Sequence, residues 1–313
     1  MAFESLAALI DAVRAGQPRA VGRLISLVEN GSEVLREAMK ELAPSTGNAH
    51  VIGLTGSPGV GKSTTTTALV RAFREQHLRV GVLAVDPSSP FSGGALLGDR
   101  VRMQQHALDR EVFIRSMATR GHLGGLSVAA PQALRVFDAA GCDVVLVETV
   151  GVGQSEVEVA AAADTTLVLL APGMGDGIQA AKAGILEIGD VFVVNKSDRE
   201  GAQALTRDLR TMVALTPYEE GAWKPPIVKT VANSGEGIDD LLATVTRHRR
   251  DAEASGRWLA KRLDRARAEV EGLALARVRA ELTIGGRSGL TDLATQVRDG
   301  RLDPYTAADR LLG

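Results

Sequence analysis

Apolar residues near the start of the chain recur at the spacing of an amphipathic helix. They fall at i, i+3, i+4 and i+7 in two successive stretches, separated by Gln17 and Pro18. This spacing predicts two helices, and a third is expected near Glu33–Leu42. The apolar positions are Leu6, Leu9, Ile10 and Val13 in the first stretch, and Val21, Leu24, Ile25 and Val28 in the second.

Between residues 48 and 247, short runs of Val, Ile and Leu alternate with helical stretches. Continuous apolar runs are typical of strands buried on both faces, so we predict an α/β fold with a mostly parallel central sheet flanked by helices. Functional loops should lie at the carboxyl ends of these strands. The predicted strands are 50–56, 79–86, 111–116, 143–149, 165–172, 190–198 and 225–233.

After residue 247 the pattern returns to helices. A 4-3-4-3 apolar spacing covers about two heptads and then meets the charged Arg277, which is too short to predict a coiled coil. We expect an antiparallel helical arm that serves as a dimer contact. The chain is therefore divided into an N-terminal helical extension (1–47), an α/β domain (48–247) and a C-terminal helical arm (248–313). The apolar positions of the arm are Leu259, Leu263, Ala266, Val270 and Leu273.

Composition excludes several classes of partner. The 313 residues include 36 Lys and Arg against 38 Asp and Glu, a net charge of −2, and only 3% are aromatic. This balance does not favour a nucleic acid or an anionic membrane as partner. No uncharged apolar run reaches the ~18 residues of a membrane span, and a basic leader is missing, so a cytoplasmic protein is expected. The single cysteine, Cys142, is interpreted as a small buried residue.

The segment "GSPGVGKS" (56–63) follows a predicted strand and precedes a helical stretch. It has the form G-x-x-x-x-G-K-[ST], whose backbone N–H groups surround phosphates. Lys62 is expected to reach the β/γ-phosphate oxygens, and the Ser63 hydroxyl to bind Mg²⁺. The predicted phosphate-binding residues are Gly56, Ser57, Pro58, Gly59, Val60, Gly61, Lys62, Ser63 and Thr64.

The segment "VVNKSD" ends a later strand with Asn195, Lys196 and Asp198. An Asp here accepts hydrogen bonds from the N1–H and 2-amino groups of guanine, which adenine lacks. Such a site discriminates by ~10⁴-fold or more. At the next strand end, the N–H groups of Ala232 and Asn233 are candidates to bind guanine O6. The predicted ligands are therefore GTP and GDP.

The segment "LVETVGVGQSE" (146–156) resembles the second phosphate element of a GTPase but differs at two positions. Glu148 stands where Asp is usual, and Gln154 comes three residues after Gly151 instead of directly after it. A Glu still reaches the Mg²⁺ shell, and Gly151 is expected to offer its N–H to the γ-phosphate. The missing water-positioning Gln predicts slow intrinsic hydrolysis until a partner acts.

Two further carboxylates lie in the region where a switch is expected, after the phosphate-loop helix. We interpret Asp86 and Asp99 as metal-linked, with an ordinary turn role as the alternative for each. The predicted Mg²⁺ site is therefore made by Ser63, Asp86, Asp99 and Glu148.

Together these segments, with "SMATRGHLGGLS" and "APGMGDGIQAAKAGILEIGD", resemble the MeaB-type GTPases, the metallochaperones associated with methylmalonyl-CoA mutase. The resemblance implies a homodimeric, Mg²⁺-dependent P-loop GTPase that gates adenosylcobalamin delivery to the mutase and protects it. It also implies an additional switch in which Gln179 and Lys182 come within reach of the nucleotide or partner. A solvated helix position remains the alternative for Lys182, and His122 is interpreted as structural.

Two other functions stay open at this point. Phosphate loops also serve kinases, and the family has carried a label as an arginine/ornithine transport-system kinase. The guanine motif argues against that reading. A scaffold that binds GTP without turnover is disfavoured by Lys62, Ser63 and the candidate metal carboxylates.

Overall fold

The computed structural model describes residues 3–87, 106, 108–119, 129–149, 155–173, 185–285 and 287–312. The chain forms two compact units, Met1–Arg262 and Leu263–Gly313. The domain boundaries predicted at 47 and 247 stay predictions; residue 247 lies within a helix, Ile238–Ala254.

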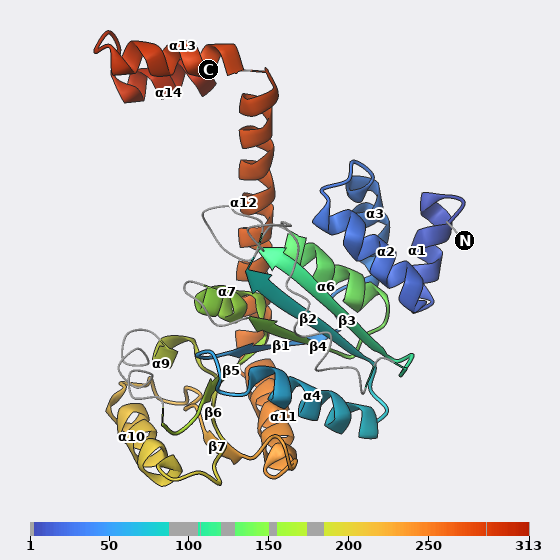
Figure 1. Ribbon diagram of the computed structural model, residues 1–313, viewed down its shortest axis with the longest axis vertical. Helices are drawn as coiled ribbons and strands as arrows, with labels where there is room; N and C mark the ends of the chain where they lie inside the picture. Colours follow the sequence, from blue (N-terminus) through green and yellow to red (C-terminus); the bar gives the residue numbers. More distant parts are fainter. Residues whose placement is uncertain are drawn as a thin grey trace. The chain divides into compact units, whose positions relative to one another are not determined.

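The helices and strands follow the predicted order (Figure 1). The three N-terminal helices are confirmed as α1 (Leu6–Arg14), α2 (Pro18–Glu29) and α3 (Leu35–Leu42), followed by the 3-10 turn η1 (Ala43–Ser45). The strands are β1 (His50–Thr55), β2 (Val80–Pro87), β3 (Val112–Thr119), β4 (Val144–Thr149), β5 (Thr165–Leu170), β6 (Val191–Asn195) and β7 (Ile227–Thr230). The remaining helices of the first unit are α4 (Lys62–Glu75), α6 (Ala129–Ala139), α7 (Ser155–Ala162), α9 (Ile185–Ile188), α10 (Ala202–Leu215) and α11 (Ile238–Ala254). Helix α12 (Arg257–Gly285) begins in the first unit, and α13 (Arg287–Arg298) and α14 (Pro304–Leu312) belong to the second.

The predicted parallel sheet is confirmed. In the described part of the chain it has seven strands in the order β3-β2-β4-β1-β5-β6-β7, and neighbouring strands pair in parallel. The strand β1 lies between β4 and β5, so the chain passes to opposite sides of β1. Such a reversal opens a crevice at the carboxyl ends of the strands, where open α/β sheets bind ligands.

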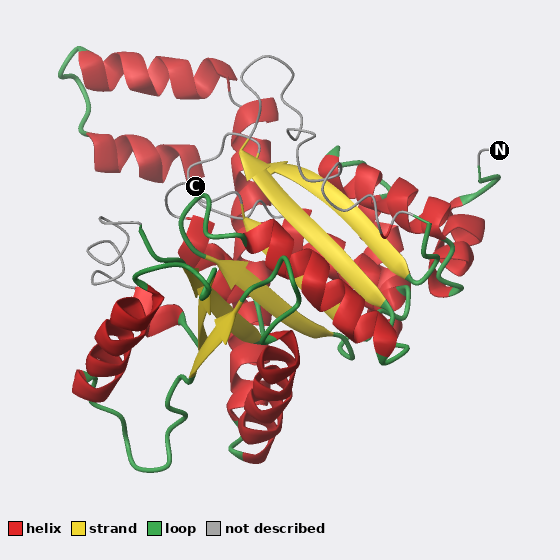
Figure 2. Ribbon diagram, turned by 60° about the horizontal axis from the view of Figure 1, so that its bottom comes forward, coloured by secondary structure: helices red, strands yellow, loops and turns green. Residues whose placement is uncertain are grey.

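Helices cover both faces of this sheet (Figure 2). Alternate residues of β1 show the division, because Ile52 and Leu54 pack with α4 and α11 whereas Val51 packs with α6 and α7. Helix α10 covers the same face as α6 and α7, where it packs against β5 and β6. Burial on both faces explains why the strand sequences are continuous apolar runs instead of alternating ones.

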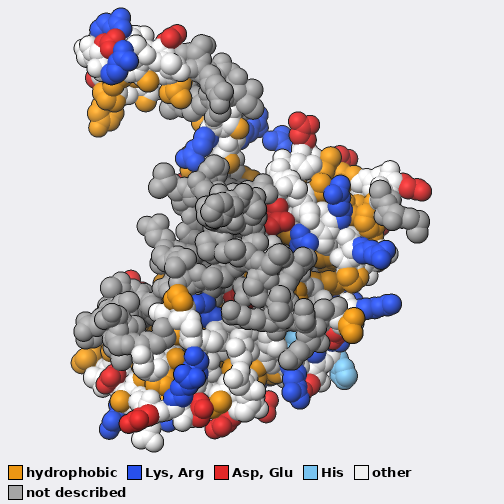
Figure 3. Space-filling view, in the orientation of Figure 1, with side chains coloured by type: hydrophobic (Ala, Val, Ile, Leu, Met, Phe, Trp, Pro, Cys, Tyr) orange, Lys and Arg blue, Asp and Glu red, His pale blue; other side chains and the backbone are white. Residues whose placement is uncertain are grey.

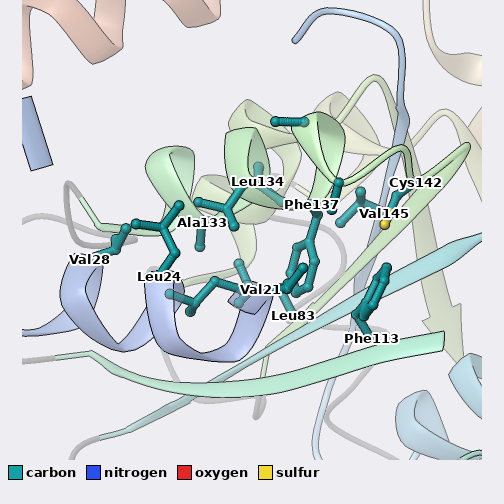
Figure 4. Packing of buried hydrophobic residues seen from close by; sticks show 14 of the residues in the cluster. Val21, Leu24, Val28, Leu83, Phe113, Ala133, Leu134, Phe137, Cys142 and Val145 are labelled. Atoms are coloured by element: carbon teal, nitrogen blue, oxygen red, sulfur yellow. The ribbon is translucent and has the colours of Figure 1, made fainter. Parts of the chain in front are cut away.

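The N-terminal helices are part of the core of the first unit. Figure 4 shows Val21 of α2 beside Phe137 of α6, with Leu24 and Val28 further along α2 towards Ala133 and Leu134, and Phe113 of β3 at the other end of the same cluster. A polar contact adds to this packing, since Arg115 of β3 donates a 2.8 Å hydrogen bond to Ser26 of α2. Cys142 is buried beside this cluster, and burial raises the pKa of its thiol, as expected for a structural cysteine.

In the second unit, α13 and α14 pack against each other. The apolar seam predicted along α12 is largely exposed within this chain: Val270 has 67% of its surface accessible and Leu263 has 52%. None of the described helices combines the length and apolarity required to cross a membrane. On the coloured parts of the face in Figure 3, acidic and basic side chains are interspersed and no large area of one sign appears.

A buried polar network lies at the amino-terminal edge of the sheet. The Thr165 hydroxyl is 2.8 Å from both His50 Nε2 and His248 Nδ1, and His248 Nε2 is 3.3 Å from Asp190. Burial would raise the pKa of Asp190, but the hydrogen bond from His248 and the charge of Lys261 outweigh it and lower that pKa. The network joins β1, β5 and α11 to the first turns of α12.

Burial lowers the pKa of His50 from its ordinary value of 6.5 to about 3, although the Asp164 carboxylate opposes the shift. The imidazole is therefore neutral in the folded protein, while the unfolded chain takes up a proton below pH 6.5. The free energy of unfolding should therefore decrease as the pH is lowered below 6.5, by up to ~1.4 kcal/mol per pH unit. We predict that the free energy of unfolding drops between pH 7 and pH 5 by about 2 kcal/mol more in the parent than in His50→Gln. Urea titrations at both pH values measure this, and an equal drop in both proteins would contradict it.

Candidate nucleotide-binding site

The phosphate loop occupies residues 56–61, between the end of β1 and the start of α4. Its three glycines all have positive φ, at 135° for Gly56, 98° for Gly61 and 81° for Gly59. Two of them also lack room for a side chain. A Cβ on Gly56 would lie 2.2 Å from the Leu169 carbonyl oxygen, and one on Gly61 would lie 2.3 Å from Asn195 Nδ2. The loop is thus packed tightly onto its neighbours at both ends.

Lys62 begins α4 and turns back over this loop. Its ammonium group donates hydrogen bonds to the carbonyl oxygens of Gly56 and Ser57, the latter at 3.1 Å, and only 8% of the residue is exposed. The side chain of Val60 is buried in the core, so a role in binding would belong to its backbone. Ser63 and Thr64 follow in the first turn of α4 and line an open cavity.

Glu148 is held against the same helix. It lies in β4 in register with Leu54 of β1 and Ala84 of β2, and only 1% of it is exposed. The Thr66 hydroxyl of α4, three residues beyond Ser63, donates a 2.5 Å hydrogen bond to its Oε2 atom. The structure therefore directs this carboxylate towards the first turns of α4, as the sequence predicts for a residue near the phosphates.

The oxygen donors at this edge fit Mg²⁺, which prefers carboxylate, hydroxyl and phosphate oxygens. Glu148 is a buried carboxylate, and Ser63 lies in the first turn of α4, the helix that it contacts. Asp86 belongs to β2, next to β4, so its backbone ends at the same edge; its side chain lies outside the described residues, as does Asp99. Among the described residues no group of three or more His, Cys, Asp or Glu side chains is placed to hold a metal ion.

The Asn195 side chain, at the end of β6, joins the phosphate loop to the end of β7. Its amide donates to the Val60 carbonyl at 2.8 Å and accepts from Thr230 Oγ1 at 3.2 Å and from the Ala232 N–H at 3.1 Å. Lys196 adds a second link at 2.6 Å to the Gly59 carbonyl, from a backbone with φ of 56°. Asn195 and Lys196 thus fasten the phosphate loop to the loops expected to bind the base.

The remaining base-binding candidates lie at the same edge. Asp198 is exposed, three residues after the buried Asn195. Ala232 and Asn233 line a cavity of about 540 Å³ together with Ser63 and Thr64. The Ala232 N–H already donates to Asn195, so its expected bond to guanine O6 stays a prediction, as does that of Asn233. Gly151, Gln154, Gln179, Lys182 and His122 lie outside the described residues.

Two contacts were not anticipated from the sequence. The sequence does not indicate that Thr66 contacts Glu148 or that Lys196 bonds to the Gly59 carbonyl. The run of four threonines from Thr64 to Thr67 was the available signal for Thr66, because position 66 lies on the same side of the helix as Lys62 and Ser63. The bond from Lys196 has no short-range sequence signal.

A parallel sheet that carries a phosphate loop after β1 and an N-K-x-D segment after β6 defines a P-loop GTPase. Comparison with known proteins then identifies the family: residues 21–285 match the family model "Methylmalonyl Co-A mutase-associated GTPase MeaB". The chain belongs to the MeaB family, as the resemblance in its sequence indicated.

Individual relatives agree with this assignment. A Pyrococcus horikoshii protein named "Putative GTPase" is 48% identical over 306 residues, covering 97% of this chain and 96% of the relative. The mouse "Methylmalonic aciduria type A homolog, mitochondrial" is 37% identical and covers 83% of this chain and 64% of the relative. A crystal structure of a protein named "LAO/AO transport system kinase" superposes with a TM-score of 0.74 at 26% identity, covering 99% of this chain and 97% of that one.

The contact between Gly61 and Asn195 gives a stability prediction. Alanine at Gly59 or Gly61 meets the same backbone strain, ~1–2 kcal/mol, because both residues have positive φ. Gly59 has open space where Cβ would lie, whereas Gly61 faces Asn195 Nδ2. We predict that Gly61→Ala destabilises the protein by about 1–3 kcal/mol more than Gly59→Ala, since it displaces a buried hydrogen-bonded amide. Urea unfolding of both variants measures the difference, and equal losses would contradict the fastening role of Asn195.

Proposed function

We propose that this protein is a Mg²⁺-dependent GTP hydrolase that acts as a metallochaperone for methylmalonyl-CoA mutase. In this role it gates delivery of adenosylcobalamin to the mutase and protects the mutase from inactivation. The observation that carries the proposal is the match to the mutase-associated GTPase family over residues 21–285, together with a complete phosphate loop and N-K-x-D segment at one edge of the sheet.

Guanine is selected in this proposal by Asp198, whose carboxylate accepts from N1–H and the 2-amino group. Adenine offers neither donor, so its binding would leave Asp198 unpaired beside the base. A cavity of about 540 Å³ lies between α4 and the loop after β7; Ser63, Thr64, Ala232 and Asn233 line part of it, whereas Asp198 does not.

The residues that would hold Mg²⁺ are Ser63, Glu148, Asp86 and Asp99. When bound, the ion neutralises negative charge on the phosphate oxygens. The protein's own contribution is positional. The phosphate-loop amides and Lys62 bind the phosphates, and burial of Glu148 keeps bulk water from its carboxylate. Gly151 is proposed to donate its N–H to the γ-phosphate.

Regulation is assigned in this proposal to Gln154 and Lys182. No Gln directly follows Gly151, so intrinsic turnover is expected in the range of ~10⁻⁴ to 10⁻² s⁻¹ that is typical of GTPases before full activation. A bound mutase accelerates turnover by stabilising the productive arrangement of these segments. The size of the acceleration is limited by how much more tightly the mutase binds that arrangement than the unproductive one.

A homodimer is also proposed. The exposed apolar positions Leu259, Leu263, Val270 and Leu273 recur at heptad-like spacing along α12, which supports a contact with a second copy of the chain.

A second candidate is a kinase linked to arginine or ornithine transport. It is favoured by one observation, the superposition with a TM-score of 0.74 on the protein named "LAO/AO transport system kinase". The two candidates differ in where the γ-phosphate goes: a hydrolase transfers it to water, and a kinase to an acceptor.

The guanine assignment predicts a change of base preference in Asp198→Asn. An amide can pair with the 2-oxo group of xanthine but not with both guanine donors. Binding of GTP should therefore weaken by at least about 100-fold and binding of XTP should improve. Calorimetric titration of the parent and the variant with both nucleotides measures this. A variant that binds GTP as tightly as the parent would remove Asp198 from the base site.

The chaperone role predicts stimulation by the partner. Addition of the cognate methylmalonyl-CoA mutase should raise GTP hydrolysis at least about tenfold, ~1.4 kcal/mol of barrier. Lys182→Ala should reduce this stimulation more than it changes basal turnover. Phosphate release measured across a saturating mutase titration checks the prediction. An unchanged rate would contradict the chaperone role, and phosphate found on an acceptor would favour the kinase.

A further inference from the structure

The contact between Thr66 and Glu148 explains why this chain has Glu where Asp is usual. Both residues are buried, with Thr66 0% and Glu148 1% exposed, and the hydroxyl lies 2.5 Å from Oε2. An Asp in the same strand position would be shorter by one C–C bond, ~1.5 Å. Its carboxylate would fall outside hydrogen-bond distance of Thr66.

The Thr66 hydroxyl has a second acceptor within reach. It lies 3.1 Å from the carbonyl oxygen of Lys62, one turn earlier in α4. Its neighbours Thr65 and Thr67 make the same kind of bond, to Gly61 at 3.0 Å and to Ser63 at 2.9 Å. In the part of the chain that the structure describes, Thr66 differs from both by also contacting a carboxylate. A hydroxyl has one proton to donate. The Thr66 hydroxyl can therefore donate either to Glu148 Oε2 or to the Lys62 carbonyl, and its donor is satisfied in both cases.

We propose that Thr66 is a positioning residue that sets the direction of the Glu148 carboxylate for the metal ion. The hydrogen bond to a charged acceptor is strong enough to select one orientation of a buried side chain. The inference rests on the proposed function, because it requires that Mg²⁺ binds with the nucleotide beside Ser63 and Glu148.

The test compares Thr66→Val with Thr65→Val. Both substitutions replace a fully buried threonine of α4 by a residue of the same shape and remove a bond to a helix carbonyl. Thr66→Val alone also removes the donor to Glu148. The measured quantity is the gain in GTP affinity due to the metal, that is, the ratio of the dissociation constants in EDTA and in Mg²⁺, determined by calorimetry.

Thr66→Val should reduce this gain about tenfold, with affinity in EDTA within twofold of the parent. Thr65→Val should keep the parent's gain, and Thr66→Ser, which retains the hydroxyl, should restore most of it. A gain in Thr66→Val equal to that in Thr65→Val would overturn the proposal. A parent that shows no gain from Mg²⁺ would instead contradict the proposed metal site itself, so the two failures can be told apart.

Glu148→Asp provides an independent arm if Thr66→Val does not fold. It withdraws the carboxylate from Thr66 while keeping its charge, and should reduce the Mg²⁺ gain by a similar factor. Where all variants fold, combining Glu148→Asp with Thr66→Val should add little, because both changes break the same bond. Thermal unfolding of each variant confirms that the protein is folded. Two results would overturn the role of Thr66. One is a gain in GTP affinity from Mg²⁺ in Glu148→Asp that equals the gain in the parent, and the other is a loss in the double variant equal to the sum of the two single losses.

Discussion

The nucleotide edge of this protein depends on the buried side-chain amide of Asn195. One donor and one acceptor group satisfy three partners on two segments: the Val60 carbonyl in the phosphate loop, and the Thr230 hydroxyl and Ala232 N–H at and just after the end of β7. A buried amide is costly to leave unsatisfied, so these bonds fix the loops relative to one another before any ligand binds. Gly61 is required beside this amide because a Cβ there would occupy its place. The phosphate side and the base side of the site are therefore one preorganised unit.

The same edge gathers the candidate chemistry because parallel strands end together. The strand β4 delivers Glu148, β1 leads into the phosphate loop, and β6 ends at Asn195. Burial of Glu148 against α4 requires a hydrogen-bond partner, which Thr66 supplies. At the opposite edge, the network around His50 and Thr165 fastens α11 and α12 to the sheet. One sheet thus positions a polar site at each end, and only the carboxyl edge carries the phosphate loop.

Local patterns in the sequence were sufficient for the elements and for the phosphate loop. Continuous apolar runs predicted all seven strands, and the loop from Gly56 to Ser63 has a defined spacing between a strand and a helix. Contacts between distant residues could not be predicted, because spacing along the chain does not specify side-chain direction across a sheet. Thr66 with Glu148, and Lys196 with Gly59, are examples. The Ala232 N–H, a candidate to bind guanine O6, donates to Asn195 in this structure, a contact that spacing along the chain does not indicate.

If the segments joined by Asn195 form a guanine-specific nucleotide site, the parent protein must distinguish GTP from ATP. Calorimetric titration with each nucleotide, at the same Mg²⁺ concentration, measures this discrimination. We expect GTP to bind tighter by about 10⁴-fold or more, since ATP leaves Asp198 without its two donors. Equal affinity for the two nucleotides would contradict a guanine-specific site.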